Sequence, residues 1–461
     1  MNFFRISPIF IFRYLLLLNF KGRIYYYQHY HKIMVLSLQE CLATRKDCSG
    51  MGRILPFSDI LELCKASHEG APSKLLYVIL PQGTDYEGGI YSYNGKELTL
   101  LSDAEKTKFT MELYPELNRN EIMNLEELIN VGLIWQYLSL KVESIGLGVS
   151  QRARGPKKIN KLVNSLTHKD QIFLYSVAVR EDNDDTVVKD TSEPLKKQLE
   201  NGTYLLNTPK CYENQAFYQG TYKGISLNDA IFNKIEKGSS NTVTLYELSQ
   251  LLWACEGEND HTTHGNRDNL EKNGFGRVHA SGCAGYSVYP IIFVKNLLDL
   301  PKGAYIYNPV GFSALKRWIK VDNNIYYDHY LQQYSSEVIF DGVKKEFDVD
   351  SSHFIILLCI DREKPCSGFM HRKIMDTTNW AEIEAGMSLA GLQLQANALG
   401  LHWEKIIISN PDNSKYRDLL QLEFAEASIN KMAQALVDLP KNEHLSLIGK
   451  LIPTVLFYTK Q

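Results

Sequence analysis

The sequence lacks the cysteine spacing of a zinc site, a redox motif or a disulfide scaffold. Its eight cysteines are scattered over 461 residues and none forms a C-x-x-C pair, which suits a reducing compartment. No basic run stands out beyond the N-terminus, and the formal charge of −3 does not indicate a nucleic-acid partner. No G-x-G-x-x-G fingerprint follows a strand pattern, so the sequence does not predict a dinucleotide site.

Acidic residues are missing from the first 39 positions. The charged residues there are all basic: Arg5, Arg13, Lys21, Arg23 and Lys32. Arg13 interrupts the apolar stretch, so we expect no stable membrane span. Residues 1–33 are either an organellar leader, although one poor in serine, or an upstream extension that is absent when translation starts at Met34. We therefore predict a cytoplasmic protein, or an imported one if the leader belongs to the natural chain.

One apolar helix pattern occurs twice. Residues 126–148 read EELINVGLIWQYLSLKVESIGLG and residues 381–403 read AEIEAGMSLAGLQLQANALGLHW, with Gly132 matching Gly386 and Gly146 matching Gly400. Apolar residues recur every three or four positions, which predicts two amphipathic helices. An interior glycine costs a helix about 1 kcal/mol relative to alanine, so its recurrence predicts a close approach of another helix or a flat ligand. Gly146 and Gly400 are placed to end the helices in the left-handed conformation.

Three further segments recur in the same order. ILELCKASHEG (60–70) matches LSQLLWACEG (248–257), GGIYSYN (88–94) matches GAYIYN (303–308), and LQECLATRKD (38–47) matches LNDAIFNKIE (227–236). Two unrelated buried helices would explain the helix pattern but not four matches in one order. We therefore predict an α+β fold of two tandem domains, residues 34–182 and 225–461, joined by a linker over 183–224. The two domains would pack on each other as an intramolecular pseudo-dimer.

These segments resemble the FMN-dependent nitroreductase superfamily, in particular the SagB-type dehydrogenases that oxidise azoline rings in peptides. The second domain carries the resemblance in LSQLLWACEG, HASGCAGYSVYPIIFV (279–294), DLPKGAYIYNP (299–309) and EAGMSLAGLQLQANALGL (384–401). The first domain carries it in TRKDCSG (44–50), GGIYSYN and its long helix, so that most of residues 36–410 are covered. The alternative fold is a single nitroreductase-like domain preceded by an unrelated peptide-binding module.

The resemblance implies FMN sites at a subunit interface, each built from parts of both subunits, and two-electron transfer at flavin N5. It implies that an arginine-containing segment holds the ribityl phosphate, that a Ser-Gly loop lies beside the ring, and that the glycine region after the long helix lines the cofactor. The cofactor-binding residues implied in this chain are Arg45, Lys46, Gln136, Gly146, Leu147, Gly148, Ser281, Gly282, Cys283 and Tyr286. No catalytic residue is assigned.

Each domain departs from a different part of the family pattern. The arginine segment survives only as Arg45-Lys46-Asp47 in the first domain, and the Ser-Gly loop survives only at 281–285 in the second. Each family site takes its arginine segment from one half and its loop from the other, so both losses fall on one site. The resemblance thus implies a monomer that acts as a pseudo-dimer with one flavin. Asp47 stands where a phosphate-binding serine would be, and an anion there is unfavourable.

Other polar residues have ordinary interpretations. HTTH (261–264) and His279 lack cysteine or carboxylate partners at fixed offsets, so we predict no metal and interpret these histidines as polar loop residues. The run QRARGPKK (151–158) is either a solvated basic loop or a secondary phosphate grip. Cys283 is better explained as a small neutral filler than as a nucleophile.

The function predicted from the sequence is an FMN-dependent oxidoreductase acting on a small-molecule or peptide-derived substrate. The competing hypothesis is a cofactor-free binding or scaffold protein, because folds often outlive their chemistry. Neither the substrate nor the electron donor or acceptor can be read from the residues.

Overall fold

The computed structural model divides the chain into two compact units, Met1–Leu36 and Ser37–Gln461, and every described helix and strand lies in the second. Residues 1–33, interpreted as a leader or an upstream extension, lie outside the described residues. Those described are 36–45, 50–117, 124–152, 157–169, 176–181, 203–205, 225–233, 243–257, 277–281, 286–294, 297, 300, 303–308, 314–317, 352–362, 378–408 and 452–460. Below, "first half" means residues 37–181 and "second half" means residues 225–460.

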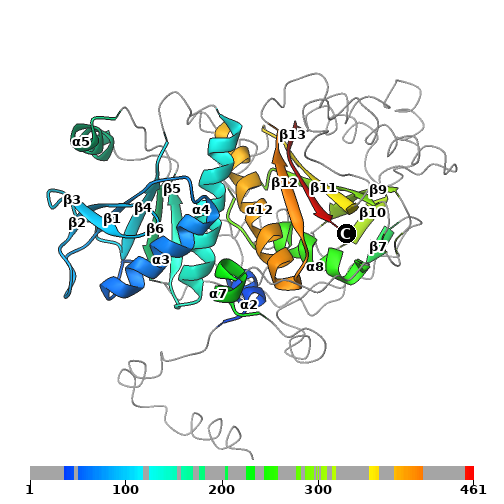
Figure 1. Ribbon diagram of the computed structural model, residues 1–461, viewed down its shortest axis with the longest axis horizontal. Coiled ribbons are helices and arrows are strands. Elements are labelled where there is room, and N and C mark those ends of the chain that lie inside the picture. The colour runs from blue at the N-terminus through cyan, green and yellow to red at the C-terminus, as the bar shows by residue number, and fades with distance from the viewer. Residues whose placement is uncertain are drawn as a thin grey trace, which may run out of the picture. The chain divides into compact units, whose positions relative to one another are not determined.

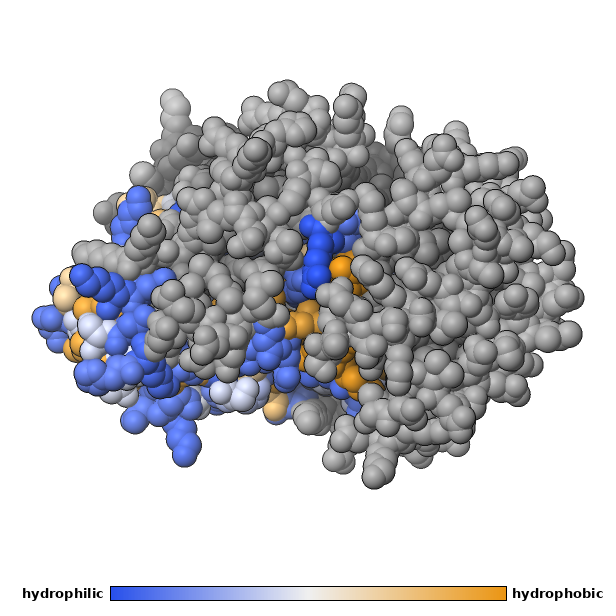
Figure 2. Space-filling model, turned by 90° about the horizontal axis from the view of Figure 1, so that it is seen from above, coloured by the Kyte–Doolittle hydropathy of each residue, from blue (hydrophilic) through white to orange (hydrophobic). Residues whose placement is uncertain are grey.

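The first half contains an antiparallel sheet with helices packed on it (Figure 1). Its helices are α2 (Leu38–Thr44), α3 (Phe57–Gly70), α4 (Leu125–Glu143) and α5 (Lys157–Thr167). Its strands are β1 (Leu76–Leu80), β2 (Gly89–Tyr93), β3 (Leu98–Ser102), β4 (Met111–Pro115), β5 (Gly148–Arg152) and β6 (Ser176–Arg180). They pair in the order β3-β2-β1-β4-β6-β5. On the face drawn in Figure 2, the described residues at the end that carries this sheet are mostly hydrophilic.

The second half contains the other sheet. Its helices are α7 (Leu227–Phe232), α8 (Leu245–Glu256) and α12 (Thr378–Leu399). Its strands are β8 (Val288–Val294), β9 (Gly303–Asn308), β10 (Ala314–Arg317), β11 (Ser352–Ile360), β12 (Trp403–Ile407) and β13 (Ile452–Lys460). The order is β12-β13-β11-β8-β9-β10, and β7 (Thr203–Leu205) adds a seventh strand beside β10. β7 lies in the stretch predicted as a linker.

The two sheets have their strands in the same order relative to the helices. In each sheet the strand after the long helix (β5 or β12) is at one edge, and the last strand of that half (β6 or β13) is beside it. The fourth strand of the half (β4 or β11) comes next, and the first three strands (β1-β2-β3 or β8-β9-β10) follow in order. The Tyr-rich strands expected at 88–94 and 303–308 are confirmed as β2 and β9. The fold is therefore α+β, as predicted, and the described strands of both sheets pair antiparallel.

The long helices α4 and α12 end in the way that their sequences predict. Gly146 has φ +71° and Gly400 has φ +66°, the left-handed conformation that favours glycine. The amide of Leu147 donates to Val142 O at 3.1 Å, and that of Leu401 donates to Ala396 O at 2.9 Å. Each pairing spans five residues, which is the longer hydrogen bond of a Schellman motif.

The amphipathic pattern expected for α4 is incomplete, because the helix is buried nearly all round. Even Gln136, Ser139 and Lys141 are at most 5% exposed. One side of α4 packs into the core of the first sheet, and that same core includes Ile383 and Met387 of α12. A helix covered on opposite sides needs no wide polar face.

The recurring interior glycines meet each other where α4 and α12 cross. A Cβ on Gly132 would overlap the carbonyl oxygen of Ile383, and one on Gly386 would overlap that of Ile129. The predicted close approach is therefore confirmed, and its partner is another helix. α4 and α12 lie side by side in Figure 1.

Contacts between the halves also come in reciprocal pairs. Ser37 and Ser226, matched positions that precede α2 and α7, form an antiparallel bridge with each other. Gln39 of α2 donates to Gln395 of α12 at 3.2 Å. Conversely, Lys141 of α4 donates to Asn228 of α7 at 2.9 Å. Asn228 is the match of Gln39, and Lys141 is the match of Gln395.

Candidate functional site

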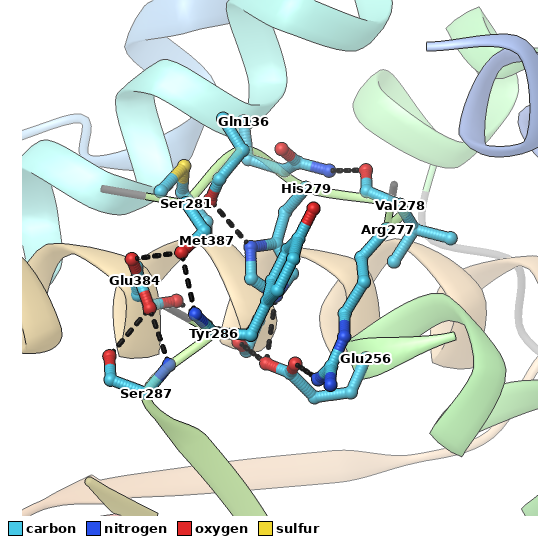
Figure 3. A network of polar contacts seen from close by, with 12 residues as sticks. Gln136, Glu256, Arg277, Val278, His279, Ser281, Tyr286, Ser287, Glu384 and Met387 are labelled. Atoms are coloured by element: carbon cyan, nitrogen blue, oxygen red, sulfur yellow. Dashed lines mark hydrogen bonds and ion pairs between the residues drawn. The ribbon is translucent and has the colours of Figure 1, made fainter. Parts of the chain in front are cut away.

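Residues 277–281 of the second half lie against side chains of the first half. The guanidinium Nη2 of Arg45, at the C-terminal cap of α2, donates to the carbonyl of Arg277 at 3.2 Å. The amide Nε2 of Gln136, on α4, donates to the carbonyl of Val278 at 2.8 Å (Figure 3). Two residues expected on the cofactor from the first half thus contact the segment that leads into Ser281.

His279, fully buried in this segment, is held by both ring nitrogens. Its Nε2 lies 2.8 Å from Glu256 Oε1 on α8, and its Nδ1 lies 2.8 Å from the carbonyl oxygen of Ala280. The carbonyl of Ala280 can only accept, so Nδ1 carries a proton, and an ionised Glu256 likewise accepts from Nε2. Burial alone would lower the pKa of His279, but the charge and hydrogen bond of Glu256 raise it above its ordinary value.

Glu256 is the carboxylate with which Arg277, His279 and Ser388 form hydrogen bonds. Its carboxylate accepts from Arg277 Nη1 at 2.6 Å, from His279, and from Ser388 Oγ on α12. Burial favours the neutral acid, yet His279 and Arg277 hold the pKa of Glu256 below its usual range. A buried carboxylate with cationic partners and hydrogen-bond donors is stably ionised.

A second carboxylate, Glu384 of α12, holds the residues that follow. It accepts from Ser281 Oγ at 2.7 Å and from Ser287 Oγ at 2.5 Å. Between these two serines, Tyr286 has φ +46°, which is unusual for a bulky side chain. Its ring has the guanidinium of Arg277 4.4 Å from its centroid and meets the His279 ring edge-on, a cation–π arrangement.

The cluster is not built for nucleophilic catalysis. Ser388 and Glu256 both face Nε2 of His279, whereas a serine triad places the acid and the serine on opposite ring nitrogens. All three side chains are buried from solvent. The described cysteines, Cys41, Cys64, Cys255 and Cys359, are also buried, and burial raises their pKa values, so they are not thiolate nucleophiles.

The structure brings Arg45, Gln136, Ser281 and Tyr286 together around residues 277–286. Gly146, Leu147 and Gly148 follow the C-terminal end of α4, which ends at Glu143, and lead into β5. Lys46, Gly282 and Cys283 lie outside the described residues, as do His261, His264 and the centre of the QRARGPKK run. Within the described part of the chain, no group of three or more His, Cys, Asp or Glu could hold a metal ion.

His279 lies in a loop, as interpreted, and there it is fully buried. It is buried because Glu256 of α8 and the carbonyl of Ala280 satisfy both its nitrogens. Sequence reasoning also missed Glu256, Arg277, Glu384 and Ser388. The usable signal was an acid inside an otherwise apolar helix, in LLWACEG and in AEIEAGMSLAG, because carboxylates are rarely buried without partners.

In the part of the chain described by the structure, no helix is both long and apolar enough to cross a membrane. No family model matches the sequence, and no curated protein matches it. Solved structures do. A candidate nitroreductase from Anabaena variabilis matches over 89% of this chain and 90% of its own, with a TM-score of 0.51 and 11% identity. This likeness shows that the chain has a nitroreductase-like fold over most of its length.

Two partial matches have lower scores. A candidate nitroreductase from Ralstonia eutropha matches over 58% of this chain and 97% of its own, with 16% identity and a TM-score of 0.33. A chain of the Escherichia coli microcin synthetase McbBCD, solved with truncated pro-MccB17 bound, matches over 51% of this chain and 72% of its own. Its identity is 13% and its TM-score is 0.30.

Proposed function

We propose that this protein is an FMN-dependent oxidoreductase whose two halves act as a built-in dimer with one flavin site. The observation that carries the proposal is the contact of Arg45 and Gln136, from the first half, with the segment leading into Ser281 of the second. A nitroreductase-like site of this kind needs residues from both partners of a dimer.

The reciprocal contacts support an internal duplication. When two copies of one unit pack about a two-fold axis, residue i of one touches residue j of the other, and j touches i. The pairs Gln39–Gln395 and Asn228–Lys141 follow this rule. The pairs Ser37–Ser226 and Gly132–Gly386 join matched positions directly, as expected for residues on the axis.

The polar cluster supports a single site, because its counterpart in the first half is missing. The match of Glu256 is Glu69, which is exposed, whereas Glu256 is fully buried. The match of Ser388 is Ile134, an apolar residue in the core of the first sheet. The matched segment in the first half also runs from Gly70 to β1 within a few residues. The second composite site would thus lack both the cluster and the Ser-Gly segment.

The residues on the intact side fit a flavin mononucleotide. Gln136 is 1% exposed, and its Oε1 has no hydrogen-bond partner among the described residues, so it can accept from an imide N–H. Arg45 provides a guanidinium for a phosphate, a charge-assisted pairing that is stronger than a neutral one. Ser281 and Tyr286 would flank the ring, and Gly146–Gly148 and Lys46 would complete the enclosure.

A bound FMN supplies two-electron transfer at N5, and this chain's residues bind and orient it. The contacts of Glu256 with Arg277 and His279 fix the segment, so that donors around the ring need not reorganise when a substrate arrives. We further propose that the substrate is a small molecule or a peptide-derived compound, and that the chain works as a monomer.

The direct test is the absorption spectrum of the full-length protein, purified from cells and then titrated with FMN. We expect flavin bands and saturation at one FMN per chain, with a monomer in light scattering. Two equivalent sites per chain would refute the single-site assignment. A colourless protein that takes up no added FMN would exclude the flavoenzyme.

That last outcome would favour the competing function, a cofactor-free binding or scaffold protein. One observation favours it: Arg45 is only 4% exposed and already holds the carbonyl of Arg277. The fold therefore uses this arginine to join its halves. A cofactor-free protein would keep the contact between Arg45 and the carbonyl of Arg277. It would also tolerate Asp47, because no phosphate would lie beside that carboxylate.

A further inference from the structure

Glu384 joins the two ends of the stretch that begins at Ser281 and ends at Ser287. Its Oε1 accepts from Ser281 Oγ at 2.7 Å, and its Oε2 accepts from the backbone amide of Ser287 at 2.8 Å and from Ser287 Oγ at 2.5 Å (Figure 3). Ser281 Oγ in turn accepts from the backbone amide of Tyr286 at 2.7 Å. A single carboxylate thus fixes Ser281 and Ser287 and, through the hydroxyl of Ser281, the backbone of Tyr286.

The carboxylate has a local task rather than a role in packing the helix. Glu384 is fully buried, and burying an ionised carboxylate is costly unless donors surround it. Its match on α4 is Asn130, which is half-buried. The crossing of the two helices therefore does not require an acid at this position.

The flanks of the stretch are fixed independently. On the incoming side, His279 holds the carbonyl of Ala280 and is itself held by Glu256 of α8. On the outgoing side, the amide of Asp361, after β11, donates to the carbonyl of Ser287 at 2.9 Å. What remains for Glu384 to determine is the distance between the ends and the backbone conformation of Tyr286.

That conformation needs support. A bulky aromatic residue with φ +46° is in a region that L side chains seldom occupy, and such residues persist only when surrounding contacts impose it. The hydrogen bond from the Tyr286 amide to Ser281 Oγ imposes it on the backbone. The contact of the Tyr286 ring with the Arg277 guanidinium fixes the position of the side chain.

We propose that Glu384 is a positioning residue, whose carboxylate clamps Ser281 to Ser287 and so holds Tyr286 in the left-handed conformation with its ring over Arg277. Ser281 and Tyr286 then have their ligand-contacting geometry before any ligand binds. The benefit for binding rests on the flavin site proposed above, whereas the clamp itself does not.

The test compares Glu384→Gln with the wild type in the full chain, by hydrogen exchange of single amides and by FMN titration. Glutamine keeps the size but replaces one acceptor oxygen with a donor. We expect the Tyr286 and Ser287 amides to exchange at least tenfold faster, with amides of β1 and α4 unchanged. FMN should bind roughly tenfold more weakly, the factor that corresponds to about 1.4 kcal/mol.

Glu382→Gln is the matched control. Glu382 is two residues away on the same helix and nearly as buried, but it pairs with Arg362 at 2.6 Å. It should leave the exchange of Tyr286 and Ser287 at the wild-type rate. If Glu384→Gln does not fold, Ser287→Ala removes one of the same hydrogen bonds and should raise exchange at these two amides by a smaller factor.

A double-mutant cycle separates positioning from a merely structural role. Tyr286→Gly removes the ring that the clamp positions, so in that background Glu384→Gln should weaken FMN binding by a smaller factor than in the wild type. Additive losses would overturn the proposal, as would wild-type exchange at Tyr286 and Ser287 in Glu384→Gln. If the wild type binds no FMN at all, the flavin function fails, and the exchange comparison alone decides whether the clamp exists.

Discussion

Gly132 of α4 and Gly386 of α12 face each other across the helix crossing, and a Cβ on Gly132 would lie 2.8 Å from the Cα of Gly386. The two residues match each other in the recurring helix pattern. A contact between matched positions is what a two-fold arrangement of two copies produces at its axis. The crossing therefore depends on glycine on both sides.

Alanine at this crossing should destabilise the protein, although alanine is the better helix former. Gly132→Ala gains about 1 kcal/mol in helix propensity, but its methyl group overlaps Ile383 O and must push the helices apart, as overpacking does at a cost of about 1–3 kcal/mol or more. The cost exceeds the gain by up to about 2 kcal/mol, and urea unfolding should show that net loss. Lys161→Ala, on the exposed side of α5, is the control and should be near neutral.

Gly386→Ala should cost about as much as Gly132→Ala, and the double variant should cost less than the sum. Once one methyl group has separated the helices, the second meets less resistance. Strict additivity would mean that the two glycines do not share one contact.

Arg45→Ala should weaken FMN binding about tenfold or more, because it removes a charge-assisted contact that is worth about 1.5–3 kcal/mol. Arg45→Lys should be intermediate, since lysine keeps the charge but not the planar fork. Fluorescence quenching of FMN measures both. Lys234→Ala, at the matched position of the second half and outside the described residues, is the control. Equal damage from Lys234→Ala would contradict the assignment of the site.

The stability of the protein should depend on pH through His279. Its pKa is raised on folding above the ordinary value of 6.5, so its contribution is fully present below about pH 6.5 and is lost as the pH rises through the folded pKa. The gap in unfolding free energy between the wild type and His279→Gln should therefore shrink from pH 6 to pH 9. A gap that widens with pH would show that the buried ring is neutral.

Gly146→Ala should cost about 1 kcal/mol or slightly more, because a Cβ is disfavoured at φ +71°. Gly146→Asn should cost less, since asparagine tolerates the left-handed conformation. Thermal unfolding of both variants gives the comparison. Equal costs for the two substitutions would point to crowding at this position rather than to backbone conformation.

Features with local causes were predicted well. The left-handed ends of α4 and α12 follow from glycine after a run of helical residues, and β2 and β9 follow from short Tyr-rich segments entered through glycine. The interior glycines predicted a close approach, but not whether a helix or a ligand would make it. That needed the position of Gly386 relative to Gly132, which are 254 residues apart.

Part of the candidate site was expected from the sequence, and part was seen only in the structure. Arg45, Gln136, Ser281 and Tyr286 were expected from a family resemblance, whereas the cluster of Glu256, Arg277, His279 and Ser388 was not expected at all. Periodicity marks which side chains are apolar, yet it does not say which buried acid meets which histidine. The burial of His279 in its loop could not be read from the sequence, because its carboxylate partner lies 23 positions away on α8.

The sequence by itself determined the helix ends, the Tyr-rich strands and the recurring pattern, because backbone conformation and periodicity depend on neighbours within a few residues. Only the tertiary structure decided that α4 lies between a sheet and α12, and that His279 pairs with Glu256. It also decided that Glu384 joins Ser281 to Ser287. Burial, ionisation and hydrogen-bond partners depend on groups brought together from distant parts of the chain, and the free energy of a buried charge depends on all of them at once.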